Sequence, residues 1–204
     1  MKHLIVTRCN FKDDESFKKY FSAMEKYYIP SINSQIDKNF KIALIVNPLH
    51  YQKIRDSIDS KIEILKFNDV KKDYREYVIS NNITIQTRHD CDDYMSPNYI
   101  KKIHELYENN KSKYDTFILN FHPYKHDSIT GKDYYHSRDY NKVCSMFSTL
   151  IQKNSSVGVF DQMHDQLSRL TRNIIYIPAN GDVKLIIHNN NALSKIIPGE
   201  KLVK

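Results

Sequence analysis

The strongest constraint on the fold is an alternation of short apolar runs and polar stretches in the first half of the chain. The runs are rich in β-branched residues, have the length of strands, and cover residues 3–7, 41–46, 61–67 and 83–87. After the first run, apolar residues recur at helical spacing behind Asp13 or Asp14, either of which can cap a helix. Further helices are expected over residues 52–60 and 73–79. This rhythm predicts a parallel sheet with crossover helices on both faces.

The second half of the chain has a different pattern, which predicts a mixed sheet. Ser96 and Pro97 are typical of the cap and first residue of a helix, here expected to run to about Glu108. Strand-like runs at 116–121 and 134–138 flank a polar, turn-rich connection, which indicates antiparallel pairing. The remaining expected elements are an apolar run at 156–160, a helix from Asp161 to about Thr171, and strands at 173–177 and 183–187. The predicted class is therefore α/β, with a sheet that is mostly parallel in its N-terminal half.

The length of 204 residues fits a single domain. We divide it into two halves, residues 1–95 and 96–196, and a basic tail, residues 197–204. Three scattered cysteines without a CxxC pair argue against a zinc ribbon and favour a reducing compartment. No signal peptide and no run of ~20 apolar residues is visible, so we expect a soluble, cytoplasmic protein without a transmembrane segment.

Composition narrows the partners and the source. A net charge of +7 favours an anionic partner, but the lysines are spread along the whole chain, as on an ordinary solvated surface, and no nucleic-acid partner is expected. The chain has only four glycines and no glycine-rich phosphate loop, which argues against P-loop and Rossmann dinucleotide sites. Abundant Lys, Asn, Ile and Tyr indicate AT-rich codons, as in a low-GC bacterium or a virus-infected host cell.

An acidic cluster, Asp90-Cys91-Asp92-Asp93, lies between the fourth predicted strand and the helix that follows it. Ligands of open α/β sheets bind outside the carboxyl ends of the strands, which is the position of this loop. Three carboxylates within four residues repel each other, and a Mg²⁺ or Mn²⁺ ion with its preference for oxygen ligands would relieve that repulsion. The alternative is an exposed acidic turn that caps the next helix. An EF-hand is excluded, because its twelfth position holds Lys101 in place of glutamate.

Four segments follow one another in the order of a known pattern. Residues 87–93, Thr-Arg-His-Asp-Cys-Asp-Asp, match a Thr-Arg-x-Asp-x-Asp-Asp signature and are followed by Pro97 and Tyr99-Ile100. The other segments are Thr7-Arg8-Cys9-Asn10, stretches within residues 29–42, and Ile186-Ile187-His188 with Asn191 and Ser194. Together they resemble a rhamnosyltransferase family of GT-A-type glycosyltransferases over residues 3–196. The tryptophan that this family carries before the late histidine is missing here.

The resemblance implies a metal-dependent glycosyltransferase with a GT-A-like, Rossmann-related fold. Residues 1–95, which end in the acidic motif, would then be the nucleotide-sugar-binding half, and residues 96–196 the acceptor-binding half. The same resemblance implies a UDP-, GDP- or dTDP-sugar donor, a Mn²⁺ or Mg²⁺ cofactor, and a glycan, lipid-linked or protein hydroxyl as acceptor. The enzyme would be a hexosyltransferase, with rhamnose as one candidate sugar. Asp92 is then the main metal ligand, Asp90 contacts the ribose or metal-bound water, and Asp93 contacts the sugar or the metal. His188 is the candidate third ligand, with a surface histidine in a polar loop as the alternative.

The resemblance also implies further donor contacts. Thr7, Arg8 and Asn10, at the end of the first strand, have the position of contacts to the nucleotide base and ribose. Arg88 either pairs with a phosphate or braces the aspartates. Capping and turn formation explain Asn10 nearly as well as a ligand contact does.

Sugar transfer needs a base that takes the proton of the acceptor hydroxyl. Asp161, expected to follow a strand and to open a helix, has the place of this base in inverting enzymes of the GT-A type, although helix capping explains it at least as well. His164 and Asp165, one turn later, could replace it. Two competing functions are a catalytically degenerate GT-A-fold glycan-binding or structural protein, for example of a virus, and a nucleic-acid-binding domain suggested only by charge and 15 tyrosines.

Overall fold

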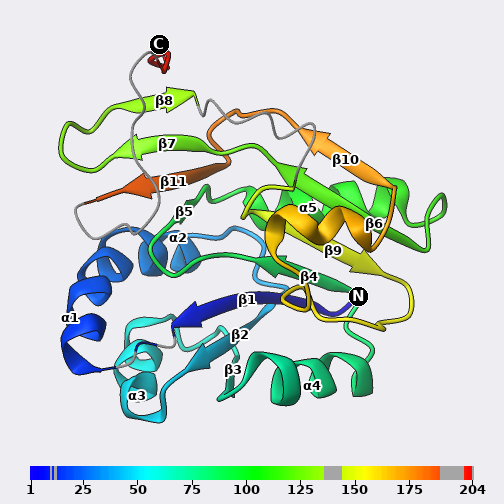
Figure 1. The fold of residues 1–204 in the computed structure, drawn as a ribbon, viewed down its shortest axis with the longest axis horizontal. Coiled ribbons are helices and arrows are strands. Elements are labelled where there is room, and N and C mark those ends of the chain that lie inside the picture. Colours follow the sequence, from blue (N-terminus) through cyan, green and yellow to red (C-terminus); the bar gives the residue numbers. More distant parts are fainter. Residues whose placement is uncertain (10, 12, 136–143, 189–199, 204) are drawn as a thin grey trace.

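A computed structural model of the chain describes residues 1–9, 11, 13–135, 144–188 and 200–203. They form one large and one small sheet with helices packed around the large one (Figure 1). The large sheet has the strand order β10-β6-β9-β4-β1-β2-β3, and the small one β5-β11-β7-β8. The strands are β1 His3–Cys9, β2 Lys41–Val46, β3 Ile64–Phe67, β4 Ile85–Arg88, β5 Tyr94–Met95, β6 Thr116–Phe121, β7 Tyr124–Asp127, β8 Asp133–Tyr135, β9 Ser148–Gln152, β10 Ile174–Ile177 and β11 Val183–Ile187.

The N-terminal half is the predicted parallel sheet. Strand β1 pairs in parallel with β2 on one side and β4 on the other, and β2 pairs in parallel with β3. The helices are α1 Asp14–Ala23, the π-helix η1 Met24–Tyr28, α2 Ile29–Asn33, α3 Pro48–Ser57, the π-helix η2 Val70–Tyr74, α4 Arg75–Ser80, α5 Tyr99–Asn110 and the 3₁₀ helix η3 His164–Arg169. The predicted alternation of strands and helices is confirmed, with shifts of a few residues at the boundaries.

Helices cover both faces of the large sheet, as predicted. Alternate residues of a strand point to opposite faces. Ile5 of β1 and Leu44 of β2 belong to a buried cluster with residues of α1, η1, α2, α3 and α5, of which Phe21 and Tyr28 are among the largest. Their neighbours along the strands, such as Val6, join a second cluster with residues of α4 and η3. The apolar spacing in the sequence therefore reflects two cores, one on each face.

Local capping chemistry moves two predicted helix starts. The third helix begins at Pro48, four residues before the predicted start, because the Asn47 side chain accepts a hydrogen bond from the Leu49 amide and proline occupies the first turn. The helix predicted from Ser96 begins only at Tyr99 after Asn98, and no side chain caps it. Ser96 is instead bonded to Asp182 in the loop before β11.

Strand β9 was not predicted. It runs antiparallel between β4 and β6, and all five of its residues are buried. The strand was missed because its sequence is partly polar. Thr149 shares a hydrogen bond with Thr87 of β4, and Ser148 donates one to Asn120 of β6. Because these hydroxyls are paired inside the sheet, a polar sequence can form a central strand.

Three further expectations for the second half are wrong. The strand expected at 134–138 is described only as far as Tyr135, as β8, and it pairs with the unpredicted β7 rather than with β6; residues 136–138 lie outside the described residues. Residues 156–160 do not form a strand. No helix opens at Asp161; the 3₁₀ helix η3 begins at His164.

Residues 200–203, expected to be part of a basic tail, pack against the small sheet. The Tyr135 amide donates to the Lys201 carbonyl, and the Val203 amide donates to the Asp133 carbonyl. Beneath them, Lys125 and Glu200 form a buried ion pair with an N–O distance of 2.8 Å. A buried charge of either sign needs such a partner, so the end of this segment is fastened to β7.

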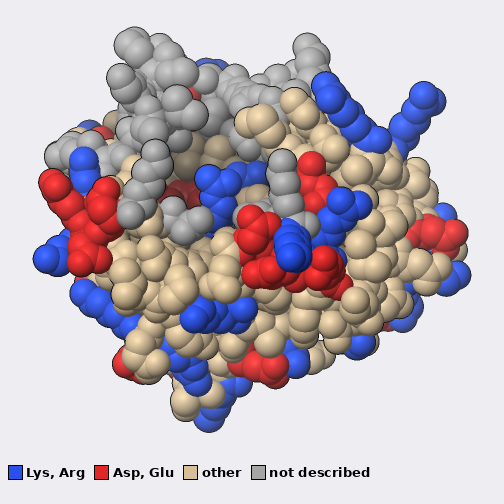
Figure 2. All heavy atoms as spheres, turned by 60° about the horizontal axis from the view of Figure 1, so that its bottom comes forward, with Lys and Arg blue, Asp and Glu red and all other residues tan. Residues whose placement is uncertain are grey.

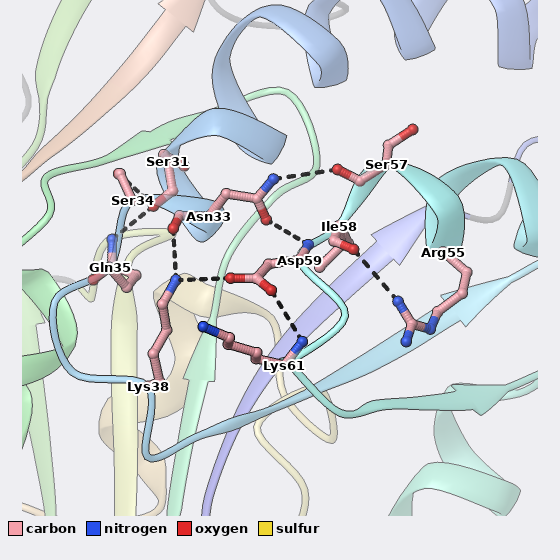
Figure 3. A network of polar contacts seen from close by, with 10 residues as sticks. All are labelled: Ser31, Asn33, Ser34, Gln35, Lys38, Arg55, Ser57, Ile58, Asp59 and Lys61. Atoms are coloured by element: carbon pink, nitrogen blue, oxygen red, sulfur yellow. Dashed lines mark hydrogen bonds and ion pairs between the residues drawn. The ribbon is translucent and has the colours of Figure 1, made fainter.

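A polar network joins helix α2 to the loop after α3 (Figure 3). Asn33 donates to the Ser57 carbonyl at 3.2 Å and accepts from the Asp59 amide at 2.9 Å. Beside it, the buried amide of Gln35 donates to the carbonyls of Ser31 and Ser96. The α2 region therefore fixes the chain just after the acidic cluster. Within the described residues, no helix is both long and apolar enough to cross a membrane.

Candidate metal and donor-binding site

The acidic cluster lies between the end of β4 and the start of β5, beside the carboxyl end of β1. The His89 amide donates to the Val6 carbonyl, which continues the β1–β4 pairing by one residue. From residue 88 to residue 93 the side chains alternate between partly exposed and buried. Asp90 and Asp92 are on the outward side, whereas His89, Cys91 and Asp93 are buried. The Asp-x-Asp spacing thus presents two carboxylates to one side of the loop.

Asp92 and His188 form a close pair. His188 Nε2 lies 3.0 Å from Asp92 Oδ2, and their side chains are 11% and 17% exposed. The antiparallel pairing of β11 with β5 carries the chain back alongside the acidic cluster and so delivers His188 to it. The ring of Tyr20 from α1 contacts the His188 ring edge-on, at 6.2 Å between centroids. A carboxylate and an imidazole that are 96 positions apart in the sequence therefore meet at the predicted metal site.

Asp93 points into the protein and holds β11. Its Oδ1 accepts a hydrogen bond of 2.9 Å from the Ile186 amide, and the residue is 1% exposed. Burial, and then the negative charges of Asp92 and Asp90, raise the pKa of the Asp93 carboxyl well above its ordinary value. In this structure Asp93 therefore connects the acidic cluster to β11, the strand that His188 follows.

Arg88 lies between the acidic cluster and the segment around Phe160. Its guanidinium stacks on the Phe160 ring at 4.6 Å, and its Nε is 3.8 Å from Asp90 Oδ1. That distance is too long for a hydrogen bond, and the buried Nε has no hydrogen-bond partner among the described residues. Arg88 both contacts an aspartate and keeps an N–H group for a further acceptor, so the two predicted roles are compatible.

The first-strand residues differ in their access to a ligand. Thr7 is fully buried, and its hydroxyl is bonded to the Tyr28 hydroxyl at 2.7 Å. The structure therefore places Thr7 in the core, although the sequence suggested a donor contact. Arg8 is exposed at the end of β1, and Asn10 lies outside the described residues.

Two buried side chains support the loop from below. The interaction with Cys9 at the end of β1, together with burial, raises the pKa of the Cys91 thiol. His89 packs between the rings of Tyr28 and Phe147, and burial lowers its pKa to about 4. Neither role could be assigned from the residue types alone, because burial alternates here in a loop with a turn at residues 91–92 rather than in a strand.

The Asp161 carboxylate is already engaged. It accepts a hydrogen bond from the Gly158 amide at 2.9 Å and pairs with Arg75 Nε at 3.3 Å. It follows no strand and caps no helix, so the positional reason for choosing it as the base is wrong. His164 and Asp165 lie in η3. The neighbouring Phe160 contacts Arg88, which puts this segment next to the acidic cluster.

The donor atoms at the site fit a hard divalent cation. Asp90 and Asp92 offer oxygen atoms on one side of the loop, and the His188 imidazole lies within 3.0 Å of Asp92. In the part of the chain that the structure describes, no three His, Cys, Asp or Glu side chains are already grouped as a complete metal site. A cation here would therefore bring Asp90 toward the existing pair of Asp92 and His188.

The described chain also has a cavity of about 330 Å³ at the opposite end of the sheet, near the amino ends of β1 and β2. Two of the lysines that line it have partners: Lys2 donates to the Asn81 carbonyl, and Lys41 pairs with Glu63 at 2.7 Å. Ligands of α/β sheets bind at the carboxyl ends, so this cavity is not the donor site. The face in Figure 2 shows Lys and Arg interspersed with Asp and Glu rather than gathered in a continuous basic band.

Comparison with known proteins gives the fold. No family profile and no curated protein sequence matches the chain. The structure is similar to that of residues 1–349 of TarS from S. aureus in complex with UDP-GlcNAc, with a TM-score of 0.55 and 10% sequence identity over 96% of this chain and 62% of that chain. It is also similar to a longer TarS structure from S. aureus, with a TM-score of 0.57 and 9% identity over 92% of this chain and 37% of that chain. The chain thus spans less than two thirds of these neighbours and has their GT-A-like nucleotide-sugar transferase fold, as the sequence predicted.

Proposed function

We propose that the chain is a metal-dependent glycosyltransferase that moves a sugar from a nucleotide-sugar donor to an acceptor hydroxyl. The observation that carries this proposal is the contact between Asp92 and His188 at the carboxyl edge of a GT-A-like sheet. The fold alone would also suit a degenerate glycan-binding protein. A carboxylate and an imidazole brought together from positions 92 and 188, beside an outward-facing Asp90, favour the enzyme.

Asp92 and His188, with Asp90, would hold a Mn²⁺ or Mg²⁺ ion. Such an ion supplies Lewis-acid stabilisation to the diphosphate that leaves when the glycosidic bond breaks. The Arg88 Nε–H group, for which the described residues offer no hydrogen-bond acceptor, is the proposed donor to a phosphate oxygen. The exposed Arg8, at the end of β1, is the proposed contact to the nucleotide. In this arrangement Asp93 acts through β11, because its carboxylate bonds the Ile186 amide.

The proposed donor is a UDP-sugar, with GDP- and dTDP-sugars as further candidates. TarS, whose fold the chain shares, has been crystallised with UDP-GlcNAc and with UDP, and this makes UDP the first nucleotide to test. The proposed acceptor is a hydroxyl of a glycan, a lipid-linked sugar or a protein, and the transferred sugar a hexose such as rhamnose or N-acetylglucosamine.

For the base that takes the acceptor proton, we propose His164 or Asp165 in preference to Asp161. Asp161 bonds the Gly158 amide and Arg75, and this engagement opposes a role in proton transfer. The contact between Phe160 and Arg88 supports a position of the same segment near the donor.

The test is the thermal unfolding of the chain with Mn²⁺ and UDP added separately and together. A ligand that binds the folded state stabilises it by RT ln(1 + [L]/Kd), about 2.7 kcal/mol at a hundred times Kd. We expect a clear rise of the melting temperature with the pair and a much smaller one with UDP alone. A melting temperature that none of UDP, GDP or dTDP changes in the presence of Mn²⁺ would refute the proposed function.

A further inference from the structure

One face of the small sheet carries a row of tyrosines that the proposed donor site does not use. Residues directly opposite each other on paired strands point to the same face. Lys184 of β11 is opposite Tyr94 on one side and Tyr124 on the other, and Tyr124 is opposite Tyr135 of β8. Three tyrosines from three strands therefore line one face around a lysine. Tyr135, at the outer strand, is 46% exposed.

The same face carries a hydrogen-bonded polar trio. His126 lies two residues after Tyr124 on β7 and is opposite Asp133. His126 Nδ1 is 2.7 Å from Asp133 Oδ1, and Lys184 Nζ is 2.6 Å from Asp133 Oδ2. These side chains keep 20% to 26% of their surface exposed. Asp133 thus holds the histidine and the lysine in place with one oxygen each.

The outer nitrogen of His126 remains for a ligand. When Nδ1 donates its proton to the carboxylate, Nε2 of a neutral imidazole is an acceptor. Among the described residues, no hydrogen bond reaches His126 Nε2. The ring of Tyr27 from η1 approaches the His126 ring edge-on at 5.9 Å, and its buried hydroxyl has no described partner. The two rings are therefore in contact, and each keeps a polar atom that the described residues do not bond.

This face is next to the proposed metal site. His126 is opposite Ile186, and His188 follows Ile186 by two residues. With strands about 4.8 Å apart and a rise of about 3.3 Å per residue, the α-carbons of His126 and His188 are ~8 Å apart. The helix that packs there gives a similar spacing, because Tyr20 contacts His188 and Tyr27 contacts His126, seven residues or ~10 Å further along. A sugar held by the metal-bound diphosphate would reach this face.

The chemistry of the face suits a hydroxyl-rich ligand. Tyrosine rings offer apolar surface for the C–H side of a sugar ring, and their hydroxyls are wet hydrogen-bonding groups. Specific sites combine such surface with a few fixed polar groups, which His126, Asp133 and Lys184 provide. The aliphatic residue on this face, Ile186, is 1% exposed, so the face offers little to a lipid chain.

On the basis of the transferase function proposed above, we propose that this face binds a sugar acceptor, and that Nε2 of His126 accepts a hydrogen bond from a hydroxyl of that acceptor other than the attacking one. We call it the tyrosine face: Tyr94, Tyr124, His126, Asp133, Tyr135 and Lys184. Asp133 is a positioning residue, since it acts by holding the imidazole and the ammonium group. The tyrosine face gives the acceptor-binding half of the chain a specific location.

The experiment uses a printed glycan array, read twice with the whole chain. The first reading measures binding of the labelled protein in the presence of UDP and Mn²⁺, and the second measures incorporation of label from a set of UDP-, GDP- and dTDP-sugars. The variants are His126→Asn, Asp133→Asn and Tyr124→Ala. Asp127→Asn is the matched control: it makes the same change on the same hairpin, at a carboxylate that bonds Ile129 and Thr130 in the turn. Stabilisation by UDP and Mn²⁺ reports donor binding in each variant.

We expect the wild type and Asp127→Asn to bind or label a set of glycans. His126→Asn and Asp133→Asn should lower that signal at least tenfold while donor stabilisation stays within twofold. A signal that survives both substitutions, or a wild type that recognises no glycan, would overturn the proposal. Failure of the transferase function is recognised separately, because the chain would then show no donor stabilisation. Glycan binding that still depends on His126 would in that case support the tyrosine face in a protein without transfer.

Discussion

His188 Nε2 lies 3.0 Å from Asp92 Oδ2, although the two residues are 96 positions apart in the sequence. The contact exists because β11 pairs with β5, directly after the acidic cluster, and because Asp93 bonds the Ile186 amide two residues before His188. The consecutive residues Asp92 and Asp93 therefore have different roles. One faces outward to His188, and the other fixes the strand that presents it.

Removal of either partner should weaken metal-dependent nucleotide binding. Asp92→Asn removes a charged oxygen ligand, and we expect it to abolish the joint stabilisation by Mn²⁺ and UDP. His188→Gln removes the imidazole, and we expect it to lower UDP affinity about 10- to 100-fold. Thermal shift titration and calorimetry measure both effects. Asp56→Asn, at an exposed carboxylate on α3, is the control and should bind like the wild type. Unchanged affinity in Asp92→Asn would remove Asp92 from the metal site.

Asp93 should matter for stability through one hydrogen bond. Asp93→Ala leaves the buried Ile186 amide without its acceptor, which costs about 1–3 kcal/mol. Asp93→Asn keeps an oxygen at the same place and removes a buried negative charge, so its cost should be much smaller. Urea unfolding of both variants without metal measures the difference. Equal losses in the two would show that the charge, and not the hydrogen bond, is what holds β11.

The sequence predicted those parts of the fold in which periodicity and burial agree. Residues Phe17, Phe21, Met24 and Tyr28 have helical spacing, and all four are buried in the segment that forms α1 and η1. Strand β9 could not be recognised because the hydroxyls of Ser148 and Thr149 are bonded to Asn120 and Thr87 on the two neighbouring strands. No local sequence pattern reveals such pairing. Strand β7 was missed for a similar reason, since Lys125 is buried only because Glu200, 75 residues later, pairs with it.

The candidate site was predictable to the extent that it is local. The Asp-x-Asp spacing and its place after a strand identified the loop, and the resemblance supplied His188. The inward turn of Asp93 depends on a distant amide, and the burial of Thr7 depends on Tyr28. Asp161 was chosen from an expected strand and helix start that did not form. The tyrosine face could not be predicted, because it requires the register of four strands.

Substitutions of Asp161 and Asp165 should have different effects: the first on the free energy of unfolding, the second on sugar transfer. Asp161→Ala removes the acceptor of the Gly158 amide, and we expect a loss of about 1–2 kcal/mol in unfolding free energy with donor binding unchanged. The pair with Arg75 adds little, because that side chain is 49% exposed. Asp165→Asn should keep stability and donor binding and reduce sugar transfer at least a hundredfold, as expected for loss of a general base. Full transfer by Asp165→Asn would leave His164 as the proposed base.

Buried histidines should make the protein less stable in mild acid. Burial, and then the charge of His104, lower the pKa of His3 well below 6.5, and burial lowers that of His89 to about 4. Below pH 6.5 these two histidines bind protons in the unfolded chain but not in the folded chain. Their contribution to the free energy of unfolding therefore falls as the pH falls. Each histidine contributes up to ~1.4 kcal/mol per pH unit in this range.

The effect of His3 can be isolated between pH 6.5 and 5. Burial acts to raise the pKa of Asp37, but hydrogen bonds from Asn39 and His104 outweigh it and lower that pKa below its ordinary value. This group therefore affects stability mainly below about pH 4, where the unfolded carboxyl becomes protonated. His3→Gln removes a titrating group while it can still bond Thr87. Asp93, whose pKa is raised in the folded protein, opposes this trend equally in both proteins, so the difference between them reports His3. In urea unfolding without metal, the variant should lose less stability than the wild type over this interval, by up to ~1.4 kcal/mol per pH unit. An unchanged slope would mean that His3 is protonated inside the folded protein, where its bonds to His104 and Thr87 would then have to rearrange.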